Sequence, residues 1–120
     1  MNVTEITGLY KAAEFGKMEK VKPTTIRDRA LRSVIVKIKL GEIRFYYDPK
    51  NPPAWPAGVS PYRLMWIYRA GKPNHISPHV LYEAVINGKF PAYIVGGHVF
   101  VNTQDPAFIE FVKGWKQKRP

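Results

Sequence analysis

Residues 23–32 combine side chains that can hydrogen-bond to base edges and to phosphates. The segment PTTIRDRALR brings together threonine hydroxyls, one carboxylate and three guanidinium groups. Arginine can donate two bonds to guanine, threonine can contact a thymine methyl or a phosphate, and aspartate can accept from cytosine. A helix that turns Ile26, Ala30 and Val34 inward points these groups outward. The outer face then carries Thr24, Thr25, Asp28 and Arg32, with Arg27 and Arg29 at its flanks.

Further cations lie on both sides of this segment. Lys20 and Lys22 precede it, where a phosphate would meet the N-terminus of the helix. Lys37, Lys39 and Arg44 follow it in a strand-like stretch. The chemistry therefore indicates a surface for a nucleic acid, and the alternative is a charged helix face that contacts only water.

The composition agrees with a polyanionic partner. The 120-residue chain has 19 Lys and Arg against 9 Asp and Glu, a formal net charge of +10. Its lack of cysteine excludes disulfides, thiolate metal sites and a cysteine nucleophile. The opening MNVTEITGLYKAAEF has neither a basic start nor an apolar run, so we expect no export and no membrane association. The expected location is the cytoplasm, in association with the nucleoid.

A proline-rich connector divides the chain. Prolines at 49, 52, 53 and 56 predict an extended segment over residues 49–59, between units at 1–48 and 60–120. The two units overlay without a gap at an offset of 55 residues, from Gly16 to Gly71. The other identities at this offset are Leu9/Leu64, Lys17/Lys72, Pro23/Pro78, Gly41/Gly96 and Phe45/Phe100.

Each copy shows the same order of predicted elements. Helical spacing opens each copy, at Leu9, Ala12 and Ala13 and again at Leu64, Ile67 and Tyr68, and a Gly-Lys pair ends it. Second helices follow at TTIRDRALRS and HVLYEAVING, each begun by a proline. The alternating stretches VIVKIKLGEIRFYYD and FPAYIVGGHVFVN then predict hairpins. A last helix with a basic tip should bury Phe108, Phe111, Val112 and Trp115.

This order predicts an α+β fold of two tandem small winged helix-turn-helix units. Each unit has two helices and a β-hairpin wing, and the second unit adds the C-terminal helix.

Residues 81–105, LYEAVINGKFPAYIVGGHVFVNTQD, resemble the excisionase and MerR-like winged-helix family. The residues that carry the resemblance are Gly88, Lys89, Phe90, Pro91, Ala92, Gly96, Gly97 and Asp105. The resemblance implies binding to double-stranded DNA, with the second helix in the major groove and the hairpin on the flanking backbone or minor groove. The first copy departs from it, because Ser33-Val34-Ile35-Val36 replaces the Gly-Lys-Phe-Pro turn.

The second copy offers a less basic face. Asn87 could read adenine and His79 a phosphate, but Glu83 repels the DNA backbone. We therefore expect the first copy to supply more of the affinity, while the second reads a half-site or contacts a protein. The candidate DNA-binding residues of the second copy are Ser77, His79, Tyr82, Asn87, Lys89 and His98.

No arrangement of residues argues for catalysis, a cofactor, a metal or a small-molecule ligand. His75 and His79 have the spacing of a metal pair, but Pro78 starts the helix between them and no third ligand is evident.

The sequence thus predicts a non-enzymatic regulator of phage or mobile-element type that binds double-stranded DNA, as a repressor or an excisionase-like architectural factor. A homodimer or higher assembly on DNA stays open. The alternatives are a winged-helix module that binds a host protein and a viral DNA-packaging recognition subunit.

Overall fold

The computed structural model describes residues 2–118 and has an α+β fold, as predicted. The helices are α1 (Ala12–Glu19), α2 (Pro23–Leu31), α3 (Ile67–Ala70), α4 (Pro78–Ile86) and α5 (Pro106–Lys118). Two 3₁₀ turns cover Pro61–Arg63 (η1) and Lys72–Asn74 (η2). The strands are β1 (Val3–Glu5), β2 (Val36–Leu40), β3 (Ile43–Tyr47), β4 (Leu64–Trp66), β5 (Ala92–Val95) and β6 (His98–Asn102).

The offset of 55 residues recurs in the strand register. In the β2–β3 hairpin Ile38 lies opposite Phe45, and in the β5–β6 hairpin their counterparts Tyr93 and Phe100 lie opposite each other. Before the helices, the bridge between Tyr10 and Tyr46 corresponds to the β4–β6 pair of Met65 and Val101. The two copies therefore share one backbone plan, and the predicted hairpins are confirmed.

The turn between the two helices also repeats. Lys20 and His75 both adopt the left-handed conformation, with φ of 59° and 56°. The preceding glycine sits close to the returning chain, since a Cβ on Gly16 would lie 2.7 Å from the carbonyl oxygen of Val21. Gly71 stands in the same relation to Ile76. The prediction that a glycine ends the first helix is confirmed for Gly71, which is the C-cap of α3. It was wrong for Gly16, which lies within α1, where the left-handed Lys20 comes four positions later.

The two hairpins pack against each other through equivalent residues. One buried cluster contains three residues of the first copy, Leu9, Leu40 and Phe45, and their three counterparts, Leu64, Val95 and Phe100. The rings of Phe45 and Phe100 meet edge to face with centroids 6.1 Å apart. We call this cluster the seam. Its existence means that neither copy buries its hairpin alone.

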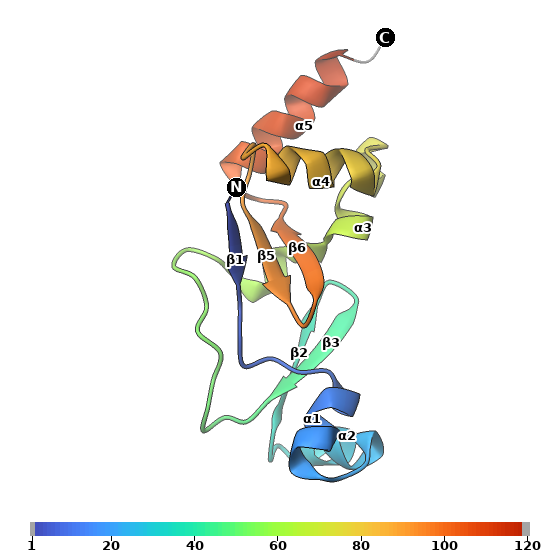
Figure 1. The fold of residues 1–120 in the computed structure, drawn as a ribbon, viewed down its shortest axis with the longest axis vertical. Coiled ribbons are helices and arrows are strands. Elements are labelled where there is room, and N and C mark those ends of the chain that lie inside the picture. The colour runs from blue at the N-terminus through green and yellow to red at the C-terminus, as the bar shows by residue number, and fades with distance from the viewer. Residues whose placement is uncertain (1, 119–120) are drawn as a thin grey trace.

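The seam lies in the middle of an elongated molecule. Figure 1 shows α1 and α2 at one end, α3 to α5 at the other, and the hairpins between them. The principal extents are 53 × 25 × 20 Å, as expected if the copies meet through their hairpins rather than their helices. Each end has its own core, around Phe15 and Ile26 in the first copy and around Leu81 and Phe90 in the second.

The N-terminal strand ties the two copies together. β1 pairs in parallel with β5 and completes the sheet β1–β5–β6–β4, whereas β2 and β3 form a separate sheet. The sequence did not predict this strand. The unit boundaries at 48 and 60 stay a prediction, but residues 3–5 lie in the sheet of the second copy.

Some expected core positions differ. Val34, predicted to face inward, is 57% exposed, because α2 ends at Leu31 and Ser33 turns the chain with a positive φ of 61°. Ile35 takes the buried place. Ala13 and Tyr68 are exposed, since both first helices begin later than the apolar spacing suggested.

The connector and the last helix complete the fold. Residues 49–59 contain no helix or strand, and they run alongside the seam, where Pro53 is buried and Trp55 packs on the cluster.

The predicted C-terminal helix is confirmed as α5, with Phe108 and Val112 in the core. Its expected basic tip includes residues 119–120, which lie outside the described residues. Within residues 2–118 no helix has both the length and the apolar character needed to cross a membrane.

Candidate nucleic-acid interface

The outer face of the β2–β3 hairpin is cationic. Lys39 lies directly opposite Arg44, and Lys37 opposite Tyr46, so all four side chains project from one face of the two-stranded sheet. Tyr46 is buried against the helices, whereas the three cations are exposed. Like charges directly opposite each other destabilise a hairpin. The pair of Lys39 and Arg44 is therefore a place where a bound anion would relieve repulsion.

Two adjoining hollows lie between this face and the helices. The larger, of about 460 Å³, opens between α1, α2 and β3, and the smaller, of about 190 Å³, lies between α2 and the hairpin. Arg27, Arg44 and Tyr46 line both hollows. We call the combined depression the basic groove. Its cations are Lys11, Arg27, Lys37 and Arg44.

The charge of the basic groove is not neutralised from within. Among the described residues, none of its four cations forms an ion pair with a carboxylate. Glu42 is the acidic residue among those lining the two hollows, and it is held by Arg69 of the second copy at 3.1 Å. The groove therefore presents net positive charge to the solvent, and its apolar floor includes Ala12 and Tyr46.

The helix α2 forms one wall of the groove and carries most of the predicted contacts of the first copy. Arg32 is exposed at its C-terminal end and pairs with the exposed Asp28 at 3.3 Å. Thr24 is exposed, and Thr25 and Arg29 are half-buried at the flank. Lys20 and Lys22 are exposed beside the first turn, where no acidic residue and no side-chain cap occupies the helix N-terminus. This end is open to a phosphate.

The corresponding face of α4 in the second copy is different. The Ser77 hydroxyl accepts from the Val80 amide at 3.4 Å and so caps the helix itself. The imidazole Nε2 of His79 lies 3.2 Å from the carboxylate Oε1 of Glu83, so these two polar groups contact each other. Asn87 and Lys89 are exposed beyond the helix end, with Lys89 beside α5. These residues do not form a cationic surface like that of α2.

His98 and Tyr82 are placed away from the other predicted contacts. His98 packs edge to face on Trp66 at 5.8 Å and on Phe45 at 6.4 Å, at the seam. Burial lowers its pKa, and the nearby Lys11 lowers it further. Tyr82 is half-buried against Tyr68, and its pKa is raised by burial and then by its hydrogen bond to Tyr68.

Sequence reasoning missed Lys11 and the position of the hairpin tips. Lys11 lies just before α1 rather than on α2 or a hairpin, and only the path of the chain brings it to the groove. The tips pack on the opposite copy: a Cβ on Gly41 would lie 3.5 Å from the Met65 sulfur, and one on Gly96 would lie 3.1 Å from the Phe45 ring. The β2–β3 tip is therefore held against β4, whereas at the β5–β6 tip Gly97 is exposed and a Cβ there would meet nothing within 4 Å.

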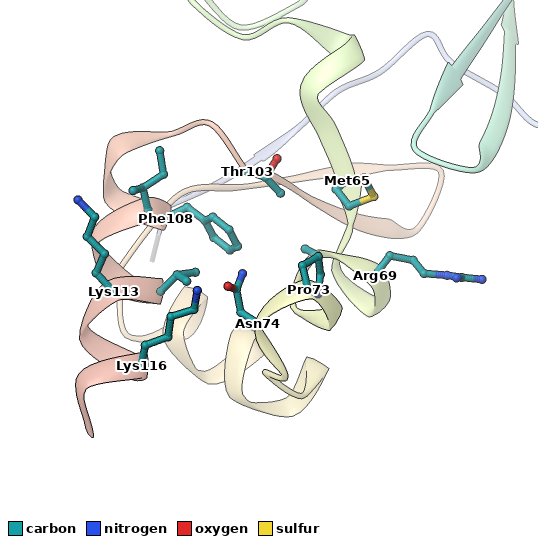
Figure 2. A pocket seen from close by; sticks show the side chains of 11 residues that line it. Met65, Arg69, Pro73, Asn74, Thr103, Phe108, Lys113 and Lys116 are labelled. Atoms are coloured by element: carbon teal, nitrogen blue, oxygen red, sulfur yellow. The ribbon is translucent and has the colours of Figure 1, made fainter. Parts of the chain in front are cut away.

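A separate hollow of about 390 Å³ lies between α3, η2 and α5 (Figure 2). Its walls are largely apolar and include Met65, Pro73 and Phe108, and the Arg69 side chain points away from it. None of the residues predicted to contact DNA lines it. Arg69, Lys113 and Lys116 also line this hollow, but Arg69 is paired with Glu42 and Lys113 with Glu110. A polyanion needs cations that are not already neutralised, so the basic groove is the stronger candidate site.

Comparison with known proteins adds no relative: a scan against protein-family models, a search of curated proteins and a search of solved structures each returned no match. Within residues 2–118 no three His, Cys, Asp or Glu side chains gather in a group that could hold a metal ion.

Proposed function

We propose that the protein binds double-stranded DNA through its first copy, with α2 in the major groove and the outer face of the β2–β3 hairpin on the flanking phosphates. The observation that carries this proposal is the basic groove between α2 and the hairpin, where four cations converge and none forms an ion pair with a carboxylate of residues 2–118. Phosphate contacts supply affinity and orientation, and side chains on the outer face of α2 supply base readout.

On this proposal each copy is a winged helix-turn-helix unit. The supporting features are the paired helices, the hairpin that follows them and the resemblance of residues 81–105 to the excisionase and MerR-like family. The protein then acts in the cytoplasm, on the nucleoid, as a repressor or excisionase-like architectural factor of phage or mobile-element type. It carries out no chemical step on the DNA.

The arrangement of the copies favours one reading helix rather than two. The helix pairs lie at opposite ends of the molecule, with their hairpins packed tip to body at the seam (Figure 1). The face of α4 also lacks the cations that α2 has. Selection of bound duplexes from a random pool should therefore return one short motif, rather than the two-part motif expected if both copies read DNA.

Salt-dependent binding to a selected duplex tests the proposal. With roughly four to six phosphate contacts, log K should fall with log salt concentration at a slope of about −4 to −5. Arg44→Ala should weaken binding to all sequences alike and reduce the slope by about 1, as expected for a phosphate contact. Arg32→Ala should cost about 1–3 kcal/mol and relax the preference at one base pair.

Lys113→Ala is the matched control, because it removes the same charge from α5 at the opposite end of the molecule. It should leave the affinity and the slope near the wild-type values. Equal affinity for duplex, single strands and RNA would show that binding depends only on net charge, and so would equal losses of affinity in Lys113→Ala and Arg44→Ala. Either result would refute the site. Loss of function in cells without any loss of DNA binding would favour a protein partner instead.

A further inference from the structure

Four aromatic rings form a continuous row across the second copy. Tyr82 of α4 meets Tyr68 of α3 at 6.2 Å, Tyr68 meets Trp66 of β4 at 4.8 Å, and Trp66 meets His98 of β6 at 5.8 Å between ring centroids. All contacts are edge to face. We call these four residues the aromatic row. Tyr68 is 47% exposed and the other three are partly exposed, while Trp66 and Tyr82 also pack on the core of the second copy, so the row lies at the surface over that core.

The aromatic row occupies the position that the basic groove has in the first copy. At the offset of 55 residues its members correspond to residues that all line the larger hollow, namely Lys11, Ala13, Arg27 and Ile43. The same surface of the shared backbone plan is thus cationic in one copy and aromatic in the other.

The two surfaces meet at the seam. Lys11 of the basic groove lies close enough to His98 of the aromatic row for its charge to lower the pKa of that imidazole. Glu42, which lines the groove, bonds to Arg69, the neighbour of Tyr68, at 3.1 Å. The basic groove and the aromatic row are therefore neighbouring surfaces at the seam.

Resting on the proposed function, we propose that the aromatic row stacks the unpaired bases of a nucleic-acid strand that leaves the duplex held at the basic groove. The preferred substrate is then a junction between duplex and single strand. Aromatic side chains bind single strands by stacking on successive bases, and cations beside them follow the backbone. The edge-to-face contacts hold the rings in place before binding, which reduces the entropy lost on ordering.

Three versions of one fluorescent duplex test this substrate: blunt, with a single-stranded extension of about six thymidines, and with an abasic extension of the same length. The extension is attached to either of the two strands in turn. With thymidines on one of them, the affinity should rise about tenfold or more over that of the blunt duplex, given the usual contribution of base–aromatic stacking. The abasic extension should raise it little, because it adds phosphates without bases. Tryptophan fluorescence should be quenched only by the thymidine extension.

Tyr68→Leu is the decisive variant, because it keeps an apolar side chain and removes the exposed ring. It should abolish the gain from the thymidine extension while binding the blunt duplex as the wild type does. Tyr62→Ala removes a tyrosine that is 83% exposed and lies outside the row, and it should keep the gain. No gain from either extension, an equal gain from both, or a gain that survives in Tyr68→Leu would overturn the inference while leaving duplex binding intact. Failure to bind any duplex would instead refute the proposed function.

Discussion

Phe45→Ala should destabilise both copies at once, because Phe45 belongs to the seam rather than to one copy. Its side chain is fully buried, packs on Phe100, and lies beside the tip at Gly96. Truncating a buried phenylalanine costs about 3–5 kcal/mol, the sum of lost burial and the cavity left behind. For a chain of this length that loss corresponds to a fall in melting temperature of roughly 10–25 °C.

The assay combines guanidinium unfolding, followed by circular dichroism, with hydrogen exchange resolved by peptide. If the seam is shared, peptides from β5–β6 should lose protection by about the same free energy as peptides from β2–β3. Tyr62→Ala should stay within about 0.5 kcal/mol of the wild type, as surface substitutions usually do. Two separate transitions in Phe45→Ala, with β5–β6 keeping its wild-type protection, would show that the copies fold independently and would refute this reasoning.

Three other substitutions probe local features of the fold. Gly71→Ala should destabilise the protein by at least about 2 kcal/mol, because its Cβ would overlap the carbonyl of Ile76. In Gly114→Ala the new Cβ on α5 meets nothing within 4 Å, so this substitution should stabilise the protein by about 0.5–1 kcal/mol. Thermal melts measure both effects, and the opposite order of stability would contradict the turn geometry. His98 has a pKa lowered by burial and by Lys11, so the unfolded chain binds its proton first and stability should fall as pH drops below about 6.5. His98→Gln should lose less stability than the wild type between pH 7.5 and pH 5.5, and equal losses would contradict this origin.

The repeat was the part of the fold that the sequence predicted best. Alternation on both sides of Gly41 and Gly96 is a local signal, and the hairpins formed where it indicated. The place of Val34 could not be predicted in the same way, because the end of α2 depends on the positive φ of Ser33, a conformation that serine adopts only where the surrounding structure requires it.

Contacts between the copies left no such signal. The strand β1 is only three residues long, too short for its pattern to show which sheet it joins. Hydrophobic alternation showed that Phe45 is buried, but not that its partner is its own counterpart Phe100. The candidate site has the same limit: the exposure of Arg44 followed from strand alternation, whereas the presence of Lys11 beside it depends on the tertiary path of the chain.

Mapping the bound surface by NMR, with a selected duplex added to isotopically labelled protein, tests the central claim most directly. The account predicts that resonances of residues 23–32 and of the outer face of β2–β3 shift together and saturate with the duplex, while those of α5 stay in place. Saturable shifts centred on α5 or on the connector, with α2 and the hairpin unaffected, would contradict it.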